Sequence, residues 1–190
     1  MDSDGLPRTL PDLLRDGLDV LFVGINPSIF SAEQGHYFAR RANRFWPSFS
    51  RSTLSRVARE AMGVAQLTPA HDGTLLAHGF GFTDLVKRPT GRADELATSE
   101  LIAGTAILAA KIKRYRPKVA CVHGMMAYRQ IRAAIMSDKS TLSLGLQPAC
   151  IARTPLFVVP NPSPANAHFT PADQTRWYDE LARYLARNDA

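Results

Sequence analysis

The fold is decided by the stretch Val20-Leu21-Phe22-Val23-Gly24-Ile25-Asn26-Pro27-Ser28. Its apolar beginning is typical of a strand buried on both faces. The chain must then turn sharply, because Gly24 tolerates unusual backbone angles and Pro27 disfavours the helical region for Asn26. Asn26 is therefore expected at the carboxyl end of a strand, where α/β proteins bind their ligands. Its carboxamide could orient a water or hold a polar substrate, and a turn that only redirects the chain would explain the same residues.

Two further apolar runs, at 119–122 and 156–159, indicate buried strands, and helical patterns lie between the strands. We therefore predict an α/β fold, a three-layer α/β/α sandwich with a central, mostly parallel sheet. Residues 1–9 are expected to form a flexible tail and residues 10–190 a single domain. The pattern also predicts a short helix at 10–14, a long loop over 28–43, and two short strands at 142–146 and 149–152.

Composition narrows the function classes. The chain has 190 residues, a formal net charge of +6 and a sequence pI of about 9.7, which is compatible with binding a phosphate backbone. No apolar run is long enough to span a bilayer, and the polar N-terminus is unlike a signal peptide, so we expect a cytoplasmic protein without a membrane partner. Cys121 and Cys150 lie far apart and in apolar runs, so we expect two buried thiols and no zinc or iron–sulfur site.

Three stretches carry a resemblance. The first runs from Gly24-Ile25-Asn26-Pro27 through Gly35-His36-Tyr37-Phe38 to Ala42-Asn43-Arg44-Phe45-Trp46, the next includes Gly81-Phe82-Thr83-Asp84-Leu85-Val86 and Arg88-Pro89-Thr90, and the last is Val159-Pro160-Asn161-Pro162-Ser163. In this order they resemble the signatures of the mismatch-specific uracil- and thymine-DNA glycosylases, over about residues 19–185. Three ordered motifs are far more specific than any one of them.

The resemblance implies hydrolysis of the N-glycosidic bond of uracil that is flipped out of DNA into a pocket. It implies that Asn26 places the attacking water and that Phe38 stacks on the pyrimidine. The base edge and the departing anion would be bound by Gly24, Ile25, Asn161 and Ser163, including backbone N–H groups around Ile25 and Phe38. It assigns DNA contacts to Ser31, Pro164, Ala165 and Asn166. No cofactor and no metal are implied, and the quoted motifs contain no lysine that could form a Schiff base, so strand cleavage is not expected.

Asp94 is the residue with two open interpretations. It precedes a long helical pattern that includes Leu101, Leu108 and Ile112, so it could be the N-cap of that helix. Alternatively, the preceding loop brings its carboxylate to the site, where it could activate water. Bacterial members of the resembled family typically carry Asn here, so Asp would add a general base. Asp84 and, more weakly, Glu95 are further candidates of this kind.

The last motif departs from the resembled family. Pro164-Ala165-Asn166 stands where bacterial members carry Gly-Leu-Ser, whose leucine fills the gap left by the flipped base and helps to read the opposite guanine. Ala165 is a poor wedge, which puts strict preference for a mismatched guanine in doubt. Ser28 also replaces the family's usual glycine after Asn-Pro.

We therefore expect a monomeric, monofunctional glycosylase of base excision repair. Its partner would be double-stranded DNA with uracil mismatches, especially G·U, and single-stranded DNA, thymine or modified pyrimidines could be further substrates. The alternatives are a nucleic-acid-binding domain of this fold without activity, and a nucleotide- or sugar-phosphate-binding α/β enzyme. Steeply salt-dependent duplex binding would argue against the second alternative.

Overall fold

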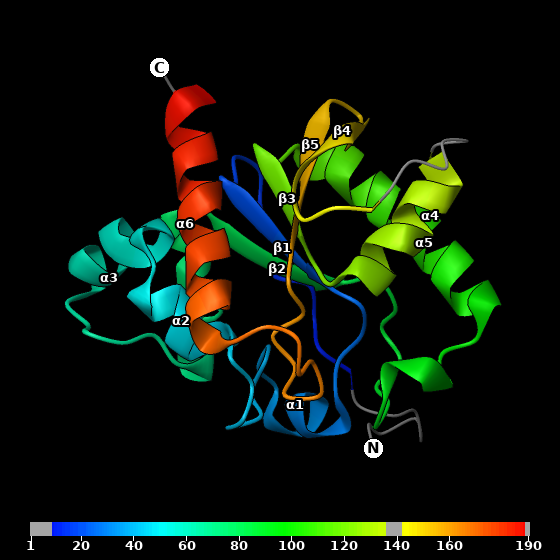
Figure 1. Ribbon diagram of the computed structural model, residues 1–190, viewed down its shortest axis with the longest axis horizontal. Coiled ribbons are helices and arrows are strands. Elements are labelled where there is room, and N and C mark those ends of the chain that lie inside the picture. The colour runs from blue at the N-terminus through cyan, green and yellow to red at the C-terminus, as the bar shows by residue number, and fades with distance from the viewer. Residues whose placement is uncertain (1–8, 136–141, 189–190) are drawn as a thin grey trace.

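A five-stranded sheet forms the centre of the computed structural model, which describes residues 9–135 and 142–188 (Figure 1). The strands are β1 (Val20–Gly24), β2 (Phe80–Asp84), β3 (Val119–His123), β4 (Gly145–Ile151) and β5 (Thr154–Val159). They lie in the order β2-β1-β3-β5-β4, and only the edge strand β4 is antiparallel to its neighbour. The predicted mostly parallel sheet is confirmed.

Helices cover both faces of this sheet. Figure 1 shows α2 (Phe45–Arg51), α3 (Arg56–Met62) and α6 (Pro171–Asn188) on one side and α4 (Thr98–Tyr115) and α5 (Met125–Ile135) on the other. Alternation along β1 divides its side chains between two buried clusters, since Val20 and Phe22 pack towards α2 and α6 while Leu21 and Val23 pack towards α4 and α5. The α/β/α sandwich predicted from the sequence is therefore confirmed.

Shorter elements connect these layers. They are α1 (Ile29–Gln34) and the 3₁₀ helices η1 (Thr53–Ser55), η2 (Pro69–His71), η3 (Thr74–His78) and η4 (Ala93–Glu95). The long loop predicted over 28–43 is thus wrong in part, because α1 lies inside it. Ser28 begins this helix by accepting a hydrogen bond from the Ser31 N–H, and Gly35 ends it in the left-handed region.

Three other local predictions are corrected. The helix expected at 10–14 is an extended segment, in which Leu13 pairs with Phe82 of β2 through two backbone hydrogen bonds of 2.9 Å. The two strands expected at 142–146 and 149–152 are the single strand β4, which forms a hairpin with β5. Alternate residues of β4 face the solvent, so Cys150 is exposed and only Cys121 is the buried thiol that we expected.

The organisation as a single domain stays a prediction, and nearly all of the tail predicted at 1–9 lies outside the described residues. Within the described ranges, no helix has both the length and the apolar character needed to cross a bilayer.

Candidate functional site

A cavity of about 810 Å³ lies at the carboxyl ends of the parallel strands. The last residues of β1, β2 and β3 line it, as does Pro160 directly after β5. All of the site residues proposed from the sequence contribute to its wall: Gly24, Ile25, Asn26, Ser31, Phe38, Asp94, Asn161, Ser163, Pro164, Ala165 and Asn166. The fold therefore gathers the three motifs around one hollow, as expected where parallel strands end together.

The loops after β1 and β2 run side by side at this edge. Leu85 N–H donates to the Gly24 carbonyl and Val86 N–H to the Ile25 carbonyl, each at 2.9 Å. Farther along, Thr90 N–H donates to Pro27 at 3.2 Å. These backbone bonds extend the strand pairing beyond the sheet, so the Gly-Ile-Asn-Pro segment is held against its neighbour rather than left as a free loop.

The Asn26 carboxamide has a fixed orientation. Its Nδ2 donates to the Arg88 carbonyl at 3.0 Å and to Thr90 Oγ1 at 2.7 Å. The Thr90 hydroxyl uses its own proton on the Arg92 carbonyl at 2.7 Å, so it must accept from Asn26. Because both acceptors require N–H donors, Oδ1 is the atom that Asn26 can offer to a ligand in the cavity.

Phe38 lies in the left-handed region, with φ at 54°. Its ring stacks on Phe45 with centroids 4.3 Å apart and planes inclined by 16°. Half-buried and part of the cavity wall, it can offer a planar apolar surface to a flat ligand.

Asn161 presents a hydrogen-bond donor to the cavity, whereas Asn26 presents an acceptor. Its Oδ1 accepts the Ser163 N–H at 3.0 Å, which leaves Nδ2 as the donor that the side chain can present. The surrounding turn is closed by Asn166, whose Nδ2 donates to the Asn161 carbonyl at 3.0 Å. Arg44 links this turn to the first motif by donating from its backbone to Pro162 at 3.0 Å and from its guanidinium to the Asn166 carbonyl at 2.9 Å.

Asp84 is the buried carboxylate of the cavity wall. It ends β2, only 4% of it is exposed, and its Oδ2 has no hydrogen-bond partner among the described residues. Burial raises its pKa to about 7, with smaller effects of Lys87, Asp12 and Lys111. Gly24 is required beside it, since a Cβ there would lie 2.4 Å from Asp84 Oδ1. The sequence named Asp84 only as a secondary candidate.

Asp94 occupies a different environment. It lies in η4 at the rim, its side chain is 57% exposed, and it forms an ion pair of 2.7 Å with Arg92. Hydrogen bonding to Arg92 lowers the pKa of this carboxyl. The N-cap interpretation is wrong, because α4 begins at Thr98 with Ala97 as its N-cap. A role of Asp94 in catalysis stays a prediction.

His123 also reaches the cavity wall but is almost completely buried. Its Nε2 lies 3.0 Å from the Tyr178 hydroxyl, and burial lowers its pKa to about 3. The imidazole is therefore neutral at physiological pH, in line with the structural role that a single histidine usually has.

The residues predicted to contact DNA differ in exposure. Pro164 and Ala165 are exposed at the mouth, and Asn166 is partly buried in the turn described above. Ser31 is buried, and its hydroxyl accepts the Ala39 N–H at 3.1 Å. Ser31 thus has a structural contact of its own, and DNA contact by any of these residues stays a prediction.

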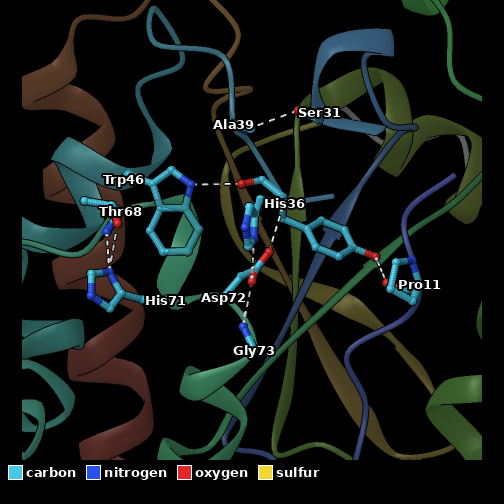
Figure 2. A network of polar contacts seen from close by, with 10 residues as sticks. Pro11, Ser31, His36, Ala39, Trp46, Thr68, His71, Asp72 and Gly73 are labelled. Atoms are coloured by element: carbon cyan, nitrogen blue, oxygen red, sulfur yellow. Dashed lines mark hydrogen bonds and ion pairs between the residues drawn. The ribbon is translucent and has the colours of Figure 1, made fainter. Parts of the chain in front are cut away.

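Two contributors were missed by the sequence reasoning. Thr90 orients Asn26, and the only signal for it was its place in the Arg-Pro-Thr stretch. Asp72 stands in the stretch His71-Asp72-Gly73, which is typical of a turn, yet its carboxylate accepts the backbone N–H of Tyr37 (Figure 2). Both act across many residues of sequence, which a local pattern does not reveal.

Among the described residues, no cluster of three or more His, Cys, Asp or Glu is arranged to hold a metal ion.

A family model described as the uracil DNA glycosylase superfamily matches residues 11–185. This match covers most of the chain and supports, in general terms, a hydrolase that removes uracil from DNA. The ordered motifs, the sandwich fold and the cavity agree with it, and the chain therefore belongs to the uracil DNA glycosylase superfamily.

Proposed function

We propose that this protein is a monofunctional DNA glycosylase that flips uracil out of DNA, especially from G·U mismatches, and hydrolyses its N-glycosidic bond. The observation that carries the proposal is that Asn26, Phe38 and Asn161, from separate stretches of the chain, line one cavity at the strand ends. Base excision repair would be its biological setting.

The geometry suits each task of such a reaction. The Phe38 ring stacks on the extruded pyrimidine, and Asn161 Nδ2 donates to a carbonyl oxygen of the base. The hydrogen bond from Asn161 Nδ2 becomes stronger as negative charge develops on the departing base. An interaction that is stronger in the transition state than in the bound substrate lowers the activation barrier. Gly24, Ile25 and Ser163 complete the wall that encloses the base.

Asn26 Oδ1 accepts a hydrogen bond from the attacking water and so directs the water oxygen at C1′ of the sugar. The oxygen–C1′ bond forms, the C1′–N bond breaks, and the base leaves with the bonding electron pair. The attacking water releases its surplus proton to the solvent, and the departing base takes up a proton from the solvent. Positive charge builds on the sugar meanwhile, and Asp94, whose lowered pKa keeps it ionised, supplies a nearby negative charge. Asn26 itself cannot remove a proton at neutral pH, so positioning of water and stabilisation of the leaving group supply most of the catalysis.

The mouth of the cavity bears on opposite-base preference. Ala165 is exposed there and its methyl group is too small to fill the space of a flipped base. We therefore propose that A·U duplexes and single strands are also substrates, with G·U fastest because a mismatched base costs least to extrude.

The test is release of uracil from G·U duplex, A·U duplex and single-stranded oligonucleotides of one sequence, with G·T duplex for thymine. The purified Asn26→Ala variant, prepared in parallel, controls for contaminating glycosylase. Release by the wild type that the variant loses supports the proposal. Absence of release from every substrate, with salt-dependent duplex binding retained, would instead identify an inactive DNA-binding domain.

A further inference from the structure

The backbone at Phe38 is strained. Hydrogen bonds from or to Asp72, Trp46 and Ser31 hold the residues around it (Figure 2). A bulky residue with φ of 54° is a conformational outlier, because its Cβ crowds the carbonyl oxygen. Such strain persists only where the surroundings impose it, and it gathers at functional sites. Here the strained residue is the one whose ring stacks on Phe45 in the cavity wall.

Asp72 provides the strongest restraint on this segment. Its Oδ2 accepts the Tyr37 N–H at 2.9 Å, and its Oδ1 accepts the Gly73 N–H at 2.7 Å and lies 3.1 Å from His36 Nδ1. Only 5% of Asp72 is exposed, so its bond to Tyr37 is a charge-assisted bond shielded from water.

The position of Asp72 is itself fixed. It follows η2 directly, and η2 is closed by His71, whose Nδ1 accepts the Thr68 N–H at 2.9 Å. The carboxylate is therefore presented from a short, capped turn rather than from a free loop.

Two further bonds complete the restraint. Trp46 Nε1 donates to the Tyr37 carbonyl at 2.9 Å, and the Ala39 N–H donates to Ser31 Oγ at 3.1 Å. In a trans peptide the carbonyl and the next N–H point in opposite directions, so the Trp46 bond directs the Phe38 N–H away from Trp46. None of the hydrogen bonds among the described residues uses this N–H, which leaves it available to a ligand.

We propose that Asp72 is a positioning residue for base binding, which through the Tyr37 N–H holds Phe38 in the left-handed conformation that presents its ring and N–H to the cavity. This inference rests on the proposed function, in which Phe38 stacks on the flipped base. Asp72 touches no reacting atom and acts only through the Tyr37–Phe38 backbone.

The first test does not depend on activity. Amide hydrogen exchange of Tyr37 is compared in the wild type, Asp72→Ala and Asp179→Ala. Asp179 is a matched control, because its carboxylate also accepts a backbone N–H, that of Thr53 at 2.7 Å, outside the residues that line the cavity. We expect exchange at Tyr37 to accelerate at least about tenfold in Asp72→Ala and to be unchanged in Asp179→Ala. Unchanged exchange in Asp72→Ala would overturn the inference.

The second test separates positioning from general stability. We expect Asp72→Ala to lower kcat/KM for uracil release by about 10- to 30-fold, the factor that corresponds to the strain of one such residue. In a Phe38→Ala background the same change should cost less than about threefold, because only the N–H of residue 38 and no ring remains to be positioned. Asp72→Asn, whose single amide oxygen can still accept the Tyr37 N–H but leaves the Gly73 N–H without its acceptor, should recover part of the activity.

Losses that multiply fully in the double variant, or an effect no larger than that of Asp179→Ala, would contradict the role of Asp72. If Asp72→Ala does not fold, Trp46→Phe tests the same restraint by removing the donor to the Tyr37 carbonyl, with the same expected dependence on Phe38. An inactive wild type whose Tyr37 exchange still responds to Asp72→Ala would refute the proposed function and leave the restraint intact.

Discussion

Two carboxylates in the wall of one cavity have opposite environments. Asp84 ends a central strand, is buried, and has its pKa raised to about 7 by loss of water. Asp94 lies on a short exposed helix, and Arg92 lowers its pKa. Environments that separate the pKa values of paired acids commonly mark different chemical tasks. At neutral pH Asp94 is therefore too weakly basic to remove a proton from water, whereas Asp84, with a pKa near neutrality, could accept a proton but is buried at the end of β2.

Asn26, unlike the two carboxylates, is uncharged, and its side chain has a fixed orientation. Its carboxamide is fixed by neutral acceptors on the loop that also carries Arg92, namely the Arg88 carbonyl and the Thr90 hydroxyl. The protein therefore fixes the orientation of Asn26, the residue that we propose to position water, while the ionised Asp94 carboxylate lies at the solvent-exposed rim.

The buried Asp84 should make the stability of the protein depend on pH, and the exposed Asp94 should not contribute to this dependence. Because the pKa of Asp84 is about 7 in the folded protein and ordinarily 3.8, the folded state binds more protons than the unfolded state between these values. The free energy of unfolding should therefore fall as pH rises through this window, by at most about 4 kcal/mol in total. Asp84→Asn should remove this slope, as measured by urea unfolding from pH 4 to pH 8. Asp94→Asn is the control, and an unchanged slope in Asp84→Asn would show that Asp84 is not the titrating group.

Removal of the Asn26 side chain should slow uracil release more than removal of the Asp94 side chain. Asn26→Ala should lower kcat for uracil release by about 100-fold or more, because the attacking water loses its orienting acceptor. Asp94→Ala should lower it by less than about tenfold, because a rim carboxylate paired with Arg92 contributes only a screened charge. Single-turnover kinetics on G·U duplex measures both. The reverse order would make Asp94 the general base and return Asn26 to a turn residue.

The smallest effect concerns what holds Asn26. Thr90→Val keeps the shape but removes the hydroxyl that accepts from Nδ2, so the carboxamide can rotate. We expect kcat to fall by about tenfold with little change in KM, because the bond acts on water placement more than on substrate binding. Thr90→Ser retains the hydroxyl and should stay within about threefold of the wild type. A loss in Thr90→Ser that is absent from Thr90→Val would assign the effect to packing of the Thr90 methyl group instead.

The fold was predictable where burial leaves a local pattern. The apolar runs that form β1, β3 and β5 are visible in the sequence. The residues Thr170-Pro171-Ala172-Asp173 are typical of a helix start, and α6 does begin there, with Asp173 accepting the Thr170 N–H at 2.9 Å. The helix predicted at 10–14 is wrong, because Leu13 pairs with Phe82 in β2, which lies far along the chain and is not visible in a local pattern. Cys150 was misplaced since an edge strand exposes alternate residues that a wholly buried strand would cover.

In the candidate site too, local patterns locate some residues, and long-range contacts that the sequence does not reveal determine others. Residues at strand ends, such as Asn26 and Asn161, could be located from the motifs that follow buried runs. The atoms that orient them could not, because Thr90 and Asp72 act on residues more than thirty positions away. The resemblance supplied the list of site residues, and only the three-dimensional contacts show which of them are held rigidly and which lie at a solvent-exposed rim.

The pairing of the loops after β1 and β2 has a consequence for how the work of recognition is divided. With these backbones joined to each other and the last motif held by Arg44, the binding site is preorganised, and little of the conformational adjustment falls on the polypeptide. In the proposed reaction, the distortion on binding would therefore be borne by the nucleic acid, and discrimination would depend on how easily the double helix deforms. We expect uracil in a flexible, easily unstacked base step to be excised more readily than uracil in a stiff one, even where the neighbouring bases make no contact with the protein.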